Sequence, residues 1–233
     1  MINLIMSDNK VDVRSENKKG AVHGYLSEEA KDNFGKTGLI VIQEWWGVNE
    51  QIKEKAQKLA KEGFVTIVPD LYRGKVAKDH EEAGHLMNDL DWVGAVQDIR
   101  GCAQYLKEHG CNKVGVTGFC MGGALAIAAV SNDYAPEIDA SAPFYGIPDP
   151  KLADPSTIKV PVQGHFGNKD ELKGFSAPED VDKLEEKFKS GNVKYELFRY
   201  DGAGHAFTNW TGPNYNEKAA NEATDRIIKF FKL

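Results

Sequence analysis

Two hydrophobic periodicities alternate along this chain. Short continuous apolar runs are typical of buried strands. We expect strands over 39–42, 64–68, 114–117, 140–145, 160–166 and 193–200. Between these runs, apolar residues recur every three or four positions, as on a helix that packs one face against a sheet. We expect helices over 52–60, 81–88, 92–109, 124–129, 178–190 and 217–231.

This alternation is typical of an α/β fold with a mostly parallel central sheet and helices on both faces. Proline cannot donate a ladder hydrogen bond, so Pro143 and Pro161 oppose two of the expected strands, and segment 11–25 stays unassigned. The length of 233 residues is common for one α/β domain, and no linker, repeat or low-complexity segment divides the chain. We therefore expect a single domain over residues 1–233.

The run 118–123, Gly-Phe-Cys-Met-Gly-Gly, joins an expected strand to an expected helix. It has the form of a nucleophile elbow, with cysteine in place of the usual serine. Glycines on both sides let the strand and the helix approach closely. The turn is expected to hold the Cys120 thiol at the carboxyl end of the sheet, where a helix N-terminus favours a thiolate or an oxyanion. The alternative is a packed cysteine without reactivity.

Two later strand ends carry partners for such a thiol, Asp170 and His205. A thiol needs a neighbouring base, and an imidazole needs a carboxylate that fixes its tautomer. The chain order of Cys120, Asp170 and His205 is the order nucleophile, acid, histidine that accompanies this elbow. We expect the three groups to meet above the carboxyl edge of the sheet. Taken alone, Asp170 is equally an ordinary turn or N-cap residue.

The motif 43–48, Gln-Glu-Trp-Trp-Gly-Val, ends the first long apolar strand. The backbone N–H groups of Trp45 and Met121 are expected to form an oxyanion hole in the usual elbow arrangement. Glu44 is expected to point into the same cleft. A structural salt bridge or a capping role is the alternative for this carboxylate.

Composition narrows the partners and the location. The net charge of −6, the pI near 5.6 and the lack of a basic stripe argue against nucleic acid and anionic membranes. The apolar patch 2–6 is too short for a signal or membrane segment, so we expect a cytoplasmic protein. The three cysteines include no CxxC pair, which argues against disulfides and a zinc site. Cys102 is expected on a buried helix face and Cys111 in a loop.

Taken together, these motifs resemble the dienelactone hydrolases, cysteine-dependent members of the α/β-hydrolase fold that include carboxymethylenebutenolidases. The matching segments span nearly the whole chain and are 42–49, 68–72, 118–123, 167–170 and 202–207. The resemblance implies hydrolysis of a lactone or carboxylic ester, in which Cys120 attacks the carbonyl, His205 is general base and acid, and Asp170 orients His205. It also implies that Glu44 helps to form the thiolate only when substrate enters, which protects the thiol from oxidation.

The chain departs from the family pattern where characterised members carry an arginine that grips a substrate carboxylate, because Asn209 stands there. Arg73, or the lysines at 75 and 78, are candidate replacements, and a solvated loop is the alternative. Aromatic residues are expected to wall the pocket or else to belong to the core. These are Trp45, Trp46, Phe144, Tyr145, Phe207 and Trp210.

Other activities fit the same residues. The thiolate is also suited to phosphotriesters or other electrophilic esters. A metal site made of His165, Asp170 and His205, a redox thiol, and a non-catalytic α/β binding protein are the remaining alternatives. Our prediction requires no metal and no cofactor, takes a small ester or lactone as the partner, and expects a monomer or a small homo-oligomer.

Overall fold

The computed structural model describes residues 9–27 and 36–232, and the apolar patch 2–6 lies outside them. The described strands form one sheet in the order β1-β2-β4-β3-β5-β6-β7-β8. The strands are β1 Lys10–Val13, β2 Val22–Leu26, β3 Thr37–Ile42, β4 Val65–Pro69, β5 Lys113–Phe119, β6 Ala140–Phe144, β7 Val162–Gly167 and β8 Tyr195–Tyr200. The helices are α1 Glu50–Lys61, α2 His80–Asn88, α3 Trp92–Glu108, α4 Met121–Val130, α5 Pro178–Ser190 and α6 Glu217–Phe230.

The strands and helices expected from the periodicity are present, with ends shifted by a few residues. Neighbouring strands from β4 to β8 pair in parallel, whereas β2 runs antiparallel to both β1 and β4. The unassigned segment 11–25 therefore forms most of an antiparallel edge pair. The predicted α/β class with a mostly parallel sheet is confirmed.

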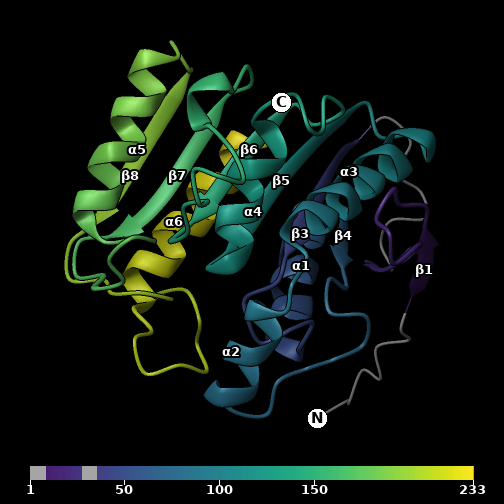
Figure 1. Ribbon diagram of the computed structural model, residues 1–233, viewed down its shortest axis with the longest axis horizontal. Coiled ribbons are helices and arrows are strands. Elements are labelled where there is room, and N and C mark those ends of the chain that lie inside the picture. Colours follow the sequence, from purple (N-terminus) through teal and green to yellow (C-terminus); the bar gives the residue numbers. More distant parts are fainter. Residues whose placement is uncertain (1–8, 28–35, 233) are drawn as a thin grey trace.

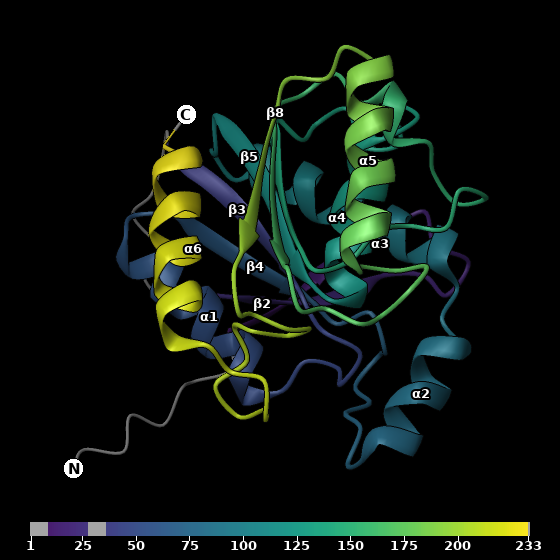
Figure 2. The ribbon, with the colours of Figure 1, turned by 90° about the vertical axis from the view of Figure 1, so that its left-hand side faces the viewer.

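Helices cover both faces of the sheet. Helices α1 and α6 lie on one face and α3, α4 and α5 on the other (Figures 1 and 2). Each face has its own buried apolar cluster. Every residue of α4 is buried, so this helix has no polar face and sits between the sheet and its neighbours as part of the core.

Short polar side chains define where the helices begin. Asn49, Asp79, Asp91 and Asn216 each accept a hydrogen bond from a backbone N–H in the first turn of α1, α2, α3 and α6. Such N-caps typically contribute about 1 kcal/mol each to stability. Two of these caps end the loops that carry Glu44 and His205, whereas α4 and α5, which follow Cys120 and Asp170, begin without a side-chain cap.

Pro143 lies inside β6 and interrupts its pairing with β7. On the two sides of it, the Ser141 N–H donates to the Pro161 carbonyl (3.0 Å) and the Tyr145 N–H donates to the His165 carbonyl (2.9 Å). Alternate N–H groups of a strand point to the same neighbour, so position 143 faces β7 without a donor. The strand prediction was correct, and the proline is tolerated at the expense of one ladder bond.

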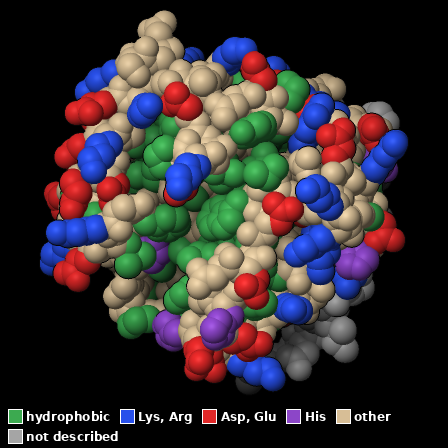
Figure 3. Space-filling model, viewed as in Figure 1, with side chains coloured by type: hydrophobic (Ala, Val, Ile, Leu, Met, Phe, Trp, Pro, Cys, Tyr) green, Lys and Arg blue, Asp and Glu red, His purple; other side chains and the backbone are tan. Residues whose placement is uncertain are grey.

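One face of the molecule is hollowed at its centre. Hydrophobic side chains gather in this hollow, and charged side chains surround it (Figure 3). Lysine, arginine and acidic side chains are interspersed around the rim, in keeping with a chain that lacks a basic stripe.

Asp98 of α3 ties the N-terminal edge to the loop after β4. Its buried carboxylate accepts hydrogen bonds from Ser15 Oγ (2.6 Å) and Asn17 Nδ2 (3.0 Å). Arg73 binds it in a bidentate manner, at 2.8 and 3.0 Å. A bidentate guanidinium and two neutral donors satisfy this carboxylate well.

We expect Asp98→Ala to lower the free energy of unfolding by about 3 kcal/mol, because it leaves the Arg73 cation and two donors without their acceptor. Urea unfolding followed by circular dichroism measures the change. Glu222→Ala is the matched control, since it removes a partly exposed carboxylate bonded to Arg226 on α6 and should cost less than about 1 kcal/mol. Equal losses in the two variants would contradict the anchoring role of Asp98.

Candidate active site

Cys120 lies between β5 and α4 in an unusual backbone conformation. Its φ is +56° and its ψ is −118°, a region that residues with a side chain rarely adopt. The Cys120 N–H donates to the Phe144 carbonyl (3.1 Å), and its own carbonyl accepts from the N–H groups of Gly123 and Ala124. Hydrogen bonds before and after the cysteine therefore hold the strained turn.

The glycines around the elbow are required by backbone contacts. A Cβ on Gly118 would lie 2.1 Å from the Gly122 carbonyl oxygen, and one on Gly123 would lie 2.1 Å from the Phe144 oxygen. Gly146 is a further member that the sequence motif did not reveal, because a Cβ there would lie 2.0 Å from the Cys120 oxygen. Since all three obstacles are backbone atoms, no side-chain movement can relieve them.

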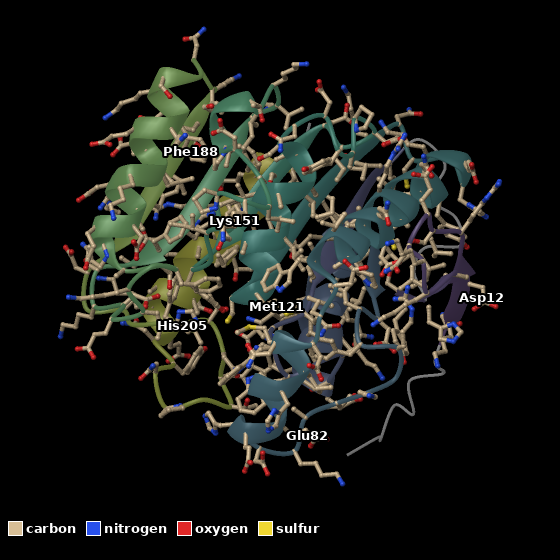
Figure 4. All side chains as sticks on the ribbon, in the orientation of Figure 1. Asp12, Glu82, Met121, Lys151, Phe188 and His205 are labelled. Carbon is tan, nitrogen blue, oxygen red and sulfur yellow. The ribbon has the colours of Figure 1, made fainter. Side chains whose placement is uncertain are left out.

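The structure brings together the three residues that the chain order predicted. His205 Nε2 lies 3.2 Å from Cys120 Sγ, and His205 Nδ1 lies 2.8 Å from Asp170 Oδ2. The thiol comes from the β5–α4 elbow, the carboxylate from the loop after β7, and the imidazole from the loop after β8. Figure 4 shows His205 near Met121, the residue that follows the cysteine. This is the geometry of a nucleophile, a base and an orienting acid.

The pKa values of His205 and Asp170 shift in the directions expected for an ion pair. Burial alone would lower the pKa of His205, but the hydrogen bonds to Asp170 and Cys120 and the charges of these two groups raise it to about 10. Burial alone would raise the pKa of Asp170, but the hydrogen bond and charge of His205, with bonds from the Leu172 N–H and Ser176, lower it. The surroundings of His205 therefore favour its protonated form, with Nε2 facing the sulfur.

Ser176 is a part of the site that sequence reasoning missed. Its hydroxyl is buried and donates to Asp170 Oδ2 (2.8 Å), and it also lies 3.2 Å from His205 Nδ1. Gly174 stands two residues before it, but no glycine follows it and the segment matches no known motif, so its place in space reveals it. The serine helps to fix the carboxylate that in turn orients the imidazole.

Glu44 is buried beside the site. Its carboxylate accepts hydrogen bonds from the Tyr145 hydroxyl at Oε1 (3.1 Å) and from Asn209 Nδ2 at Oε2 (2.9 Å). Burial raises the pKa of Glu44, against the charge of Lys55, these two hydrogen bonds and the charge of His205. Neutral donors thus hold this carboxylate inside the protein.

The two expected oxyanion donors lie at the right places in the chain. Met121 is the first residue of α4, where a helix leaves its own N–H groups unpaired. Trp45 stands in the turn after β3, which the Gly47 N–H closes by donating to the Glu44 carbonyl (3.2 Å). Among the described residues, neither the Trp45 nor the Met121 N–H donates a hydrogen bond to the protein. Their role as oxyanion donors stays a prediction.

The expected substrate-binding residues differ in their surroundings. Arg73 is taken up by Asp98, and Asn209 by Glu44. Tyr145 and Phe207 are fully buried, so they belong to the core behind the site. Trp46 is partly exposed and packs edge-on against Trp45 and His80, the first residue of α2.

Other cysteines and histidines have structural surroundings. Cys102 is buried on α3 and Cys111 lies in the loop before β5, both as expected; Cys111 is buried too, and burial raises the pKa of both thiols. His165 is also buried, stacks on Phe144 and lies 2.8 Å from the Tyr200 hydroxyl, and burial lowers its pKa to about 3. Across 9–27 and 36–232, no group of three or more His, Cys, Asp or Glu side chains is placed to hold a metal ion.

An elbow at the end of a central parallel strand, with helices on both faces of the sheet, defines the α/β-hydrolase fold. Residues 22–233 match the model of the dienelactone hydrolase family. A protein of Aquifex aeolicus (strain VF5) named "Putative carboxymethylenebutenolidase" is 34% identical over 225 residues, which cover 91% of this chain and 93% of that protein. The chain belongs to the dienelactone hydrolase family. The predicted class of hydrolase acting on ester bonds is confirmed.

Solved structures agree on the fold. A Klebsiella pneumoniae structure titled "Putative Dienelactone Hydrolase" is 24% identical, covers 95% of this chain and 97% of its own, and has a TM-score of 0.81. A "Dienelactone Hydrolase-like Promiscuous Phospotriesterase P91" from metagenomic libraries is 21% identical, with coverage of 95% and 96% and a TM-score of 0.77. Within the part of the chain that the structure describes, no helix is long and apolar enough to cross a membrane.

The close backbone contacts at the elbow predict how one added methyl group changes stability and activity. Gly146→Ala should lower the free energy of unfolding by more than about 2 kcal/mol and reduce activity, because its Cβ meets the Cys120 carbonyl. Gly84→Ala on α2 has open space around its Cβ and should be neutral or stabilising by up to about 1 kcal/mol. Thermal unfolding and ester hydrolysis check both variants. An unaffected Gly146→Ala protein would show that the elbow can relax.

A second test concerns the proton on His205. Asp170→Asn removes a charge and changes a hydrogen bond that raise the pKa of His205, so the imidazole should lose its proton well below the value of about 10 expected for the parent. An NMR pH titration of the His205 ring protons, assigned by comparison with His205→Ala, measures this. The same titration midpoint in the parent and Asp170→Asn would show that Asp170 does not control the imidazole.

Proposed function

We propose that the protein hydrolyses lactones or carboxylic esters through an acyl-enzyme on Cys120, with His205 as general base and acid and Asp170 as the orienting carboxylate. The observation that carries this proposal is the continuous line from Cys120 Sγ to His205 Nε2 (3.2 Å) and from His205 Nδ1 to Asp170 Oδ2 (2.8 Å). A protonated imidazole in contact with the sulfur favours the thiolate, which is the reactive form.

In the first half-reaction, the Cys120 sulfur forms a bond to the carbonyl carbon, and the carbonyl electrons move to the oxygen. The free N–H groups of Trp45 and Met121 are the donors for this oxyanion. When the oxyanion collapses, the ester C–O bond breaks, and the proton on His205 Nε2 passes to the leaving alkoxide. The result is an acyl thioester and an alcohol, which in a lactone remain parts of one molecule.

In the second half-reaction, neutral His205 takes a proton from water while the water oxygen attacks the thioester carbonyl. The carbon–sulfur bond then breaks, which releases the acid and restores the thiolate beside the imidazolium. Asp170 stays ionised throughout and stabilises the imidazolium. Ser176 and the Leu172 N–H hold Asp170 in position.

Neutral esters and lactones suit this site better than substrates with a free carboxylate. Asn209 is neutral and bonded to Glu44, and Arg73 is occupied by Asp98. Neither residue offers a free cation to a substrate anion. The family resemblance assigns Glu44 the formation of the thiolate on substrate entry, whereas the mechanism above starts from a thiolate that protonated His205 stabilises, so this role of Glu44 stays a separate expectation.

The proposal is tested with a panel of esters and lactones, with and without a carboxylate. Cys120→Ala should abolish turnover, and Cys120→Ser should be slow because the site suits a thiol. Mass spectrometry after mixing with p-nitrophenyl acetate should find the acetyl group on Cys120 in the parent. Cys102→Ala is the matched control and should keep both the adduct and the rate. Turnover at the parent rate by Cys120→Ala would end the acyl-thiol mechanism.

Phosphotriester hydrolysis is the second candidate, because one similar structure is that of a protein titled as a promiscuous phosphotriesterase. The same sulfur and oxyanion donors suit attack at phosphorus. A neutral p-nitrophenyl phosphotriester separates the two reactions. A higher kcat/KM for this compound than for p-nitrophenyl acetate would favour the second candidate.

Three properties stay predictions from the sequence. They are the single domain over 1–233, the cytoplasmic location, and the monomer or small homo-oligomer. Size-exclusion chromatography with light scattering tests the last of these.

A further inference from the structure

A buried lysine lies behind the candidate active site. Lys55 projects from α1, and its Nζ donates to the Thr208 carbonyl (2.8 Å) and to Thr208 Oγ1 (2.7 Å). The ammonium also lies 4.4 Å from the centre of the Phe119 ring and 5.1 Å from that of Trp210. The triad does not use this lysine. Burial of a cation costs free energy unless the cation is paired and hydrogen-bonded, so the partners of Lys55 indicate its role.

Hydrogen bonds connect this lysine to Glu44 without a gap. Thr208 Oγ1 lies 2.7 Å from the Tyr145 hydroxyl, and that hydroxyl donates to Glu44 Oε1 at 3.1 Å. Because Lys55 must donate to Thr208 and Tyr145 must donate to Glu44, the threonine hydroxyl donates to the tyrosine. All three bonds therefore point in one direction, from the ammonium to the carboxylate.

The lysine end of this series of hydrogen bonds lies at a small cavity. The cavity has a volume of about 60 Å³, and the side chains that line it include Lys55, Lys58, Thr208 and Trp210. This volume is large enough for water. Cys120, Asp170 and His205 are not among the described residues that line it. Lys55 and Thr208 thus line a space that the thiol does not reach.

We propose that Lys55 is a positioning residue whose positive charge keeps the Glu44 carboxylate ionised. Lys55, Thr208 and Tyr145 also form a proton relay between Glu44 and this cavity. One proton leaves Lys55 Nζ for Thr208 Oγ1, the Thr208 proton moves to Tyr145, and the Tyr145 proton moves to Glu44 Oε1. The transfer turns an ammonium and a carboxylate into an amine and a carboxylic acid. The reverse sequence restores the ion pair.

The charged groups around both ends support this assignment. Burial lowers the pKa of Lys55 to about 7, with the charge of Glu44 opposing and that of Lys58 adding to the shift. The groups that face Glu44 are Tyr145, Asn209, Lys55 and His205. Of these, only Lys55 and His205 carry a positive charge, and His205 is already engaged by Asp170 and Cys120. Both charges lower the pKa of Glu44, and the effect of Lys55 is the larger.

Infrared spectroscopy tests the proposal without any need for turnover, so a failure here is distinct from a failure of the proposed hydrolysis. The C=O band of protonated Glu44 is assigned by its loss in Glu44→Gln and then followed against pH. In Lys55→Met the loss of the cation should raise the midpoint of this band by about one pH unit or more. Lys55→Arg should restore the midpoint of the parent.

Lys58→Met is the matched control, because Lys58 lies one turn further along the same helix and its Nζ also stands over Trp210, at 4.4 Å. It should leave the midpoint near that of the parent. Thr208→Val keeps Lys55 but removes the hydroxyl that links its ammonium to Tyr145, so it serves if Lys55→Met does not fold, and the weaker hold on the ammonium and on Tyr145 should raise the midpoint by a smaller amount. Equal midpoints in the parent, Lys55→Met and Thr208→Val would overturn the proposal.

Activity supplies a second readout, which rests on the proposed function. If Glu44 acts as a carboxylate, the acid limb of the kcat/KM profile should move to higher pH in Lys55→Met by the same amount as the infrared midpoint. KM and kcat at high pH should change little. A uniform loss of kcat at every pH would indicate a merely structural lysine and would contradict the proposal.

Discussion

The close approach of backbone to backbone around Cys120 is the constraint on which the rest of the site depends. The Gly123 and Gly146 positions touch carbonyl groups of β6 and of the elbow at distances that exclude any side chain. This contact holds a cysteine at a φ of +56°, which places the sulfur at the start of α4 and within reach of an imidazole from another loop. Without it, the thiol would relax into the helix, and the bond to His205 would be lost.

The two buried carboxylates of the site have different surroundings, and their pKa values shift in opposite directions. Asp170 accepts from a cation, a hydroxyl and a backbone N–H, and its pKa is lowered. Glu44 accepts from a tyrosine and an asparagine, and its pKa is raised. Environments that push the pKa values of neighbouring acids apart allow each to play a different role. The surroundings of Asp170 favour its ionised form, whereas burial makes the charged form of Glu44 more costly.

Local patterns in the sequence account for much of the fold and the core of the site. The continuous apolar runs and the helical spacing identified the parallel strands and their helices, because burial on both faces removes polar residues from such strands. The glycine frame, Asp170 and His205 were found because each follows a strand end. The antiparallel edge at 11–25, Gly146, Ser176 and the partners of Arg73 depend on contacts between distant segments, for which one sequence holds no local signal.

The missing ladder bond at Pro143 leaves a seam between β6 and β7, where one backbone hydrogen bond of the sheet is absent. The strand that carries Cys120 lies on one side of this seam, and the strands that precede Asp170 and His205 lie on the other. The pair formed by β7 and β8 is continuous, so the loops that carry the acid and the imidazole begin at strands that are paired along their whole length. A small shear along the seam would therefore change the distance from sulfur to imidazole before it changed that from imidazole to carboxylate. The hydrogen bond from the Tyr145 N–H to the His165 carbonyl crosses the seam close to the nucleophile and limits this sliding.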